Sequence, residues 1–104
     1  MSFYYDPPAN IELIAEVGDG GGYDWNIACV WRDLDTGKLH GGSDSGCSCY
    51  GPFDPSMTDV ATASDLPEIT SRQQARELAD EIYESYATED EKLTFVNKVA
   101  EALK

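Results

Sequence analysis

The stretch DWNIACVWRD, residues 24 to 33, constrains the fold more than any other part of the chain. Apolar side chains occupy both the odd and the even positions of its middle, residues 27 to 31. Successive side chains of a β-strand point to opposite faces of the sheet, so this strand would be apolar on both faces. The pattern therefore predicts the central strand of a sheet.

Two shorter patterns flank this strand. IELIAEV, residues 11 to 17, alternates apolar and acidic residues, which predicts a strand with one buried face. The apolar residues expected on that face are Ile11, Leu13, Ala15 and Val17. The glycine-rich segment 18 to 24 predicts a hairpin loop, and DTG at residues 35 to 37 predicts a turn into a short third strand, KLHGG. These elements form an antiparallel meander.

Two helices are predicted after residue 70. SRQQ at residues 71 to 74 fits a capping box, and apolar residues then recur at helical spacing to about residue 86. TEDE at residues 88 to 91 fits a second capping box, with three carboxylates favoured by the helix dipole. The buried face of this second helix is expected to hold Leu93, Val96, Val99, Ala100 and Leu103.

Only one or two residues would separate these helices, which predicts a tight helical hairpin. Residues 54 to 70 are predicted to form a surface connection with one short helical turn. The predicted fold is α+β: a three-stranded antiparallel β-meander packed on one face by a C-terminal two-helix hairpin, in a single domain of residues 1 to 104. We expect Trp31 to be buried beneath the hairpin, against Leu78, Ile82 or Val96.

The charge of the chain narrows the choice of partner. The 104 residues include 20 acidic and 7 basic side chains, for a formal net charge of -13. Phosphates would be repelled, so we expect no direct contact with nucleic acid, and a protein with a basic surface becomes the favoured partner. The alternative is that the charge only keeps the protein soluble.

No apolar run is long enough to span a membrane, and no signal peptide is recognised, so we expect a cytosolic protein.

The segment DSGCSCYGPF, residues 44 to 53, contains the only closely spaced cysteines. In an extended backbone, Cys47 and Cys49 would present both thiols to one side. A structural zinc site needs four ligands, and the remaining soft ligands are Cys29 and His40. The expected register places His40 and Cys29 on opposite faces of the sheet, so we predict no metal and no cofactor.

The same segment has two other interpretations. As architecture, Asp44 and Ser45 would bind local amides, glycines 46 and 51 would permit sharp turns, and Phe53 would be an apolar plug. As a thiol enzyme it would need His40 as the base, while its acidic neighbours would raise the thiol pKa. We therefore predict that the protein is not an enzyme.

A resemblance adds one expectation. CVWRDLDTGKL, then DSGCSC, GPFD and a DLP connection into a helix resemble a family of small uncharacterised proteins encoded by actinobacterial bacteriophages, over roughly residues 25 to 85. SGCSC followed by PF is the specific motif. The resemblance implies phage origin and a place in the host cytoplasm, and it brings no assigned activity.

The function predicted from these observations is a non-enzymatic module that binds and modulates a host or phage protein. The acidic side chains expected on one face of the first helix are candidate contacts, and so is the cysteine segment as the rim of a site. The candidate residues are Asp44, Cys47, Cys49, Phe53, Glu77, Glu81 and Glu84. The alternative is a small metal-binding or thiol-dependent protein centred on Cys47 and Cys49.

Overall fold

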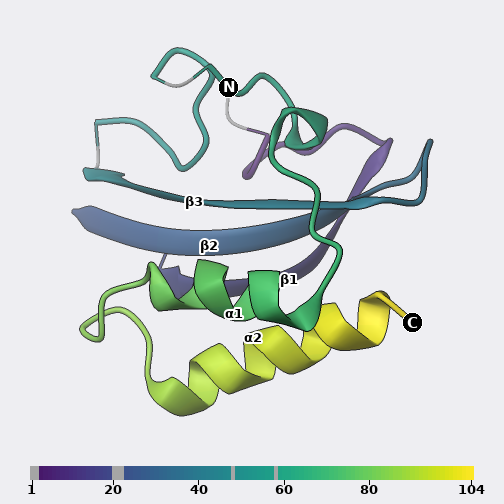
Figure 1. Ribbon diagram of the computed structural model, residues 1–104. Coiled ribbons are helices and arrows are strands. Elements are labelled where there is room, and N and C mark those ends of the chain that lie inside the picture. The colour runs from purple at the N-terminus through teal and green to yellow at the C-terminus, as the bar shows by residue number, and fades with distance from the viewer. Residues whose placement is uncertain (1–2, 20–22, 48, 58) are drawn as a thin grey trace.

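A sheet between two covering layers forms the molecule. The computed structural model describes residues 3 to 19, 23 to 47, 49 to 57 and 59 to 104. The elements are β1 (Ile11–Asp19), β2 (Asp24–Asp33), β3 (Leu39–Cys47), a short 3-10 helix η1 (Ala63–Asp65), α1 (Arg72–Asp80) and α2 (Glu89–Ala102). The strands are antiparallel in the order β1-β2-β3, and both helices cover one face (Figure 1). The α+β meander with two C-terminal helices is confirmed.

The central strand is buried on both faces, as its sequence predicted. Ala28 and Val30 of β2 belong to the core under the helices, and Ile27, Cys29 and Trp31 belong to a second core on the opposite face. An irregular layer made of the N-terminal segment and the connection between β3 and α1 covers that second face (Figure 1). The sheet therefore has two separate hydrophobic cores.

The prediction that Trp31 lies beneath the helices is wrong. Trp31 faces the irregular layer, where its ring packs edge-on against Phe3 at 5.0 Å and Phe53 at 5.1 Å between ring centroids. The shielding of both tryptophans is confirmed, since Trp25 and Trp31 are each 2% exposed. Phe53 is likewise buried, which confirms its prediction as an apolar plug.

A β-bulge changes the faces of β1. The pairing with β2 shifts by one residue at Ile14, so that Leu13 pairs with Trp31 while Ala15 pairs with Val30. An extra residue in one strand moves every later side chain to the other face. Ile11 therefore lies in the core of the irregular layer and Val17 in the helix-side core, which corrects the prediction of one shared apolar face.

The third strand is longer than predicted. β3 continues through the DSGC residues, so Cys47 is the last residue of the strand. Gly46 is part of this strand and not of a turn: a Cβ there would lie 2.7 Å from both the Trp25 ring and the Tyr50 hydroxyl. The glycine permits this close packing. The predicted loop of residues 18 to 24 lies partly outside the described residues.

Both helices begin at the predicted caps, but α1 ends early. The side chains of Ser71 and Thr88 accept hydrogen bonds from the third backbone N–H of their helices. The helix α1 ends at Asp80 because the following backbone turns toward the sheet, where the buried Asn26 side chain accepts the Tyr83 N–H at 2.9 Å. The connection to α2 is therefore longer than the tight hairpin that was predicted.

The buried face of α2 is also rotated from the predicted one. Leu93 is 40% exposed, and the buried positions are Lys92, Phe95, Val96 and Val99. None of the described helices is long and apolar enough to cross a membrane.

Candidate functional site

The connection from η1 to α1 passes along the outer edge of β3 and joins it briefly. Gly41 donates its N–H to the carbonyl oxygen of Pro67 at 3.0 Å, and Ile69 donates to that of Leu39 at 2.8 Å. These bonds form one antiparallel bridge between His40 and Glu68. The chain then leaves the sheet and enters α1 (Figure 1).

A groove opens where the connection reaches the strand from η1, beside residues 41 to 43 of β3. Its volume is about 630 Å³, and it lies between β3, the connection and α1. Its lining consists of Gly41, Gly42, Ser43, Leu66, Pro67, Glu68, Ile69, Gln74, Glu77, Leu78 and Glu81. The lining includes three glutamates and no lysine or arginine, so we call it the acidic groove.

Two of these glutamates have no cationic partner among the described residues. Glu68 lies 3.9 Å from the Lys38 ammonium, whereas Glu81 accepts only the Ser43 hydroxyl, at 3.2 Å, and no side-chain contact joins Glu77 to a described cation. Both glutamates were predicted as binding residues, and the fold brings them together at the edge of β3. Their charge is available to an external partner.

The two arginines of α1, Arg72 and Arg76, bind side chains outside the acidic groove. Arg76 binds Glu89 at 2.7 Å and Asp80 at 3.1 Å. Its hydrogen bond lowers the pKa of Glu89, and the hydrogen bonds to Glu89 and Asp80 raise the pKa of Arg76. Arg72 donates to Asn97. Neither arginine neutralises the acidic groove.

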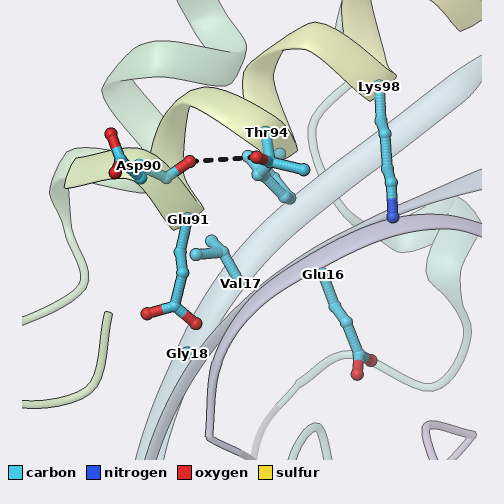
Figure 2. A pocket seen from close by; sticks show the side chains of 8 residues that line it. Glu16, Val17, Gly18, Asp90, Glu91, Thr94 and Lys98 are labelled. Atoms are coloured by element: carbon cyan, nitrogen blue, oxygen red, sulfur yellow. Dashed lines mark hydrogen bonds between the residues drawn. The ribbon is translucent and has the colours of Figure 1, made fainter. Parts of the chain in front are cut away.

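A second groove, of about 310 Å³, lies between β1 and α2 at the opposite edge of the sheet. Figure 2 shows Glu91 and Lys98 of α2 reaching toward β1, where Glu16 projects from the strand. The Thr94 hydroxyl donates to the Asp90 carbonyl oxygen at 3.0 Å. This groove carries three carboxylates, those of Glu16, Asp90 and Glu91, and one ammonium, that of Lys98, so it is also acidic on balance but holds a cation of its own.

The predicted cysteine pair lies at the far end of β3. Cys47 is half-buried and Cys49 is exposed. A hydrogen bond between the two thiols, together with the Cys49 backbone N–H, lowers the pKa of Cys47, and the thiol contact raises the pKa of Cys49. The Trp25 indole N–H donates to the Cys47 carbonyl oxygen at 2.9 Å, which holds this turn against the sheet. Two thiols in contact have the chemistry to form a disulfide or to bind a soft metal.

The four candidate metal ligands do not converge, although the predicted reason was wrong. His40 pairs with Trp31, so it shares a face with Cys29 instead of lying opposite. Its Nδ1–H donates to the Leu66 carbonyl oxygen at 2.8 Å. Seven residues of strand, about 23 Å, separate His40 from Cys47. Burial raises the pKa of Cys29, and no cluster of three or more metal-binding side chains occurs within the described ranges.

Of the remaining candidate residues, Asp44 and Phe53 have structural roles and Glu84 lies on the surface. The carboxylate of Asp44 accepts the backbone N–H groups of Ser45 at 2.9 Å and Phe53 at 2.8 Å. Phe53 has the left-handed φ of 58°, so Asp44 stabilises a strained position of the irregular layer. Glu84 is exposed in the connection after α1 and does not line the acidic groove.

Sequence reasoning missed Ser43 and the two preceding glycines as parts of a site. The available signal was the run of small residues GGSDSG after an apolar strand, which leaves room for a neighbouring segment to approach the backbone. The search of curated proteins returned no match, and neither did the search of solved structures. A family model matches all of residues 1 to 104, and the chain therefore belongs to the family described as Domain of unknown function (DUF7574).

Proposed function

We propose that this protein is a non-enzymatic interaction module, encoded by a phage and acting in the host cytoplasm, that binds a host or phage protein with a basic surface. The observation that carries the proposal is the acidic groove, where Glu77 and Glu81 lie beside an exposed strand edge without a described cationic partner. The phage origin and the location rest on the SGCSC and PF resemblance.

Electrostatics supports a basic partner. The net charge of -13 attracts cations at long range, and a groove lined by one sign of charge concentrates that field. Complementary charge raises association rates and discriminates against acidic partners. The acidic groove would then position a lysine or arginine close to Glu77 and Glu81.

The test is affinity capture from host and infected-cell lysates with matched charge variants. We expect the double variant Glu77→Gln/Glu81→Gln to lose the captured partner. The control Glu12→Gln/Glu84→Gln removes the same charge from exposed positions outside the groove and should retain it. If both double variants lost the partner equally, only the net charge would matter. If both retained the partner equally, the acidic groove would be excluded as its binding site.

A second candidate function is favoured by the hydrogen bond between the Cys47 and Cys49 thiols, which places two soft ligands side by side. On this alternative the protein binds a soft metal or exchanges thiols. Metal content of the protein purified without chelator, compared with that of Cys47→Ser/Cys49→Ser, decides it. A metal retained by the wild type alone would favour this candidate.

A further inference from the structure

The outer edge of β3 carries unpaired backbone groups inside the acidic groove. The residues that turn their N–H and C=O outward alternate along β3, and the bonds of Leu39 and Gly41 to the connection identify them as the odd-numbered ones. The next in the series is Ser43, whose backbone groups have no described partner. Ser45 follows, and its N–H is already bound to the Asp44 carboxylate.

The connection thus acts as a fourth strand that is limited to one bridge and does not extend along the edge to Ser43. An extended segment entering the groove would continue the sheet from that point, accepting the Ser43 N–H and donating to the carbonyl oxygens of Gly41 or Ser43. Such addition of a strand to an exposed edge is a recurrent way of binding peptides, with the backbone supplying affinity and alternate side chains supplying specificity.

The side chains of such a segment would alternate between the two faces of the sheet. On the helix side they would meet Glu77 and Glu81, because the Ser43 side chain points to that face and donates to Glu81. On the other side they would meet Leu66, which packs so closely over Gly42 that a Cβ there would lie 2.8 Å from its side chain. A basic residue alternating with an apolar one fits this environment.

The other edge and a second copy fit less well. β1 has a bulge at Ile14, which disrupts the regular row of backbone groups, and its groove includes Lys98. Pairing two copies through β3 would bring the same glutamates of both chains together, at a net charge of -13 each. Charge complementarity therefore favours a different, basic chain.

We infer that β3 binds an extended segment of the partner protein by strand addition at Ser43, with lysine or arginine at alternate positions facing Glu77 and Glu81. The inference rests on the proposed function and adds the conformation of the bound segment. It also assigns the backbone of Ser43, in addition to the glutamates, as a binding group.

The test uses the full chain and a peptide of alternating lysine and valine, of about six to eight residues, a usual strand length. Two forms of the peptide are methylated, one on the lysine amides and one on the valine amides. Amide groups of alternate residues point to opposite edges of an extended chain, so strand addition requires only one of the two sets. The Kd is measured by calorimetry, and the exchange of the Ser43 and Ser45 amides is followed by NMR.

We expect one methylated form to bind at least about tenfold more weakly than the other, since each backbone hydrogen bond lost contributes to the Kd. The Ser43 amide should exchange at least about tenfold more slowly in the complex, with little change at Ser45. Glu77→Gln/Glu81→Gln should weaken binding by at least about tenfold, through loss of the charge-assisted contacts.

Equal binding by both methylated forms, or an unprotected Ser43 amide, would overturn strand addition and leave the capture experiment to decide the proposed function. Failure of the unmodified peptide to bind would likewise overturn the inference. Protection of Ser43 in a dimer without peptide would assign this edge to a second copy of the chain instead. If the groove variant lost the captured partner but the Ser43 amide were not protected in the peptide complex, the proposed interaction module would stand and strand addition at β3 would be excluded.

Discussion

The two faces of the sheet are covered in different ways. On the helix side the core is mainly aliphatic, with Val30 and Ala28 of β2 packed against α1 and α2. On the other side it is aromatic, with Phe3, Trp31 and Phe53 in mutual contact under a layer whose described residues form no long helix or strand. Large rings bury more area for each residue that must be ordered, which suits a layer made of irregular chain.

The difference shows where backbone polar groups find partners. A helix satisfies most of its N–H and C=O groups internally, whereas an irregular layer needs side chains to bind them. In the irregular layer the Asp44 carboxylate accepts the Phe53 N–H at 2.8 Å, and the Asp65 carboxylate accepts the Ala61 N–H at 3.0 Å. On the helix side the comparable contact is between Asn26 and the N–H of Tyr83, just after α1 ends.

The largest effect should come from Trp31→Ala. Removing this ring leaves a cavity between Phe3 and Phe53, and we expect a loss of about 3 to 5 kcal/mol in the free energy of unfolding. Urea denaturation followed by far-UV circular dichroism measures it. Val30→Ala is the matched change on the helix side and should cost about 2 kcal/mol. An equal loss of unfolding free energy in the two variants would contradict a larger contribution from the aromatic core.

The next largest effect should come from Asp44, whose carboxylate accepts the backbone N–H groups of Ser45 and Phe53. Asp44→Ala leaves the Ser45 and Phe53 amides without their charged acceptor, so unfolding should become about 2 to 3 kcal/mol easier. Asp44→Asn keeps one carbonyl oxygen and should lose less. Thermal melts of both variants test this order, and an alanine variant as stable as wild type would show that Phe53 keeps its left-handed φ without Asp44.

The corresponding helix-side variant is Asn26→Ala. It removes the acceptor of the Tyr83 N–H, and we expect a cost of about 1 to 2 kcal/mol in unfolding free energy. Asn97→Ala, at an exposed position of α2, should change stability by about 0.5 kcal/mol or less. If the two asparagine variants were equally stable in denaturant, the Asn26 contact would contribute no more to stability than an exposed asparagine.

The smallest effect is a pH dependence of the irregular layer. The N–H of Asp35, and then the Ser64 hydroxyl, lower the pKa of Asp33 in the folded protein. The ionised form therefore stabilises the fold at neutral pH, and this contribution is lost as the pH falls from about 5, through the ordinary aspartate pKa of about 3.9 and on through the lower pKa of the folded protein. Urea midpoints at several pH values should fall less steeply for Asp33→Asn than for wild type. An unchanged slope would contradict this assignment, and Asp59→Asn is the exposed control.

Much of the fold could be predicted because its signals are local. The apolar residues 27 to 31 identified the central strand, and the side chains of Ser71 and Thr88 marked the starts of both helices through bonds that span three residues. The candidate site was predicted in part: Glu77 and Glu81 line a groove, but Glu84 does not, because α1 ends at Asp80.

The sequence by itself determined the order of elements, the central strand, the capped helix starts and the excess of negative charge. Tertiary structure decided which face each residue of β1 occupies, through a bulge at Ile14 that periodicity alone does not reveal. It also decided that Trp31 faces the irregular layer and that Glu77 and Glu81 lie beside the open backbone of Ser43. Periodicity and caps depend on near neighbours, whereas these outcomes depend on partners far along the chain.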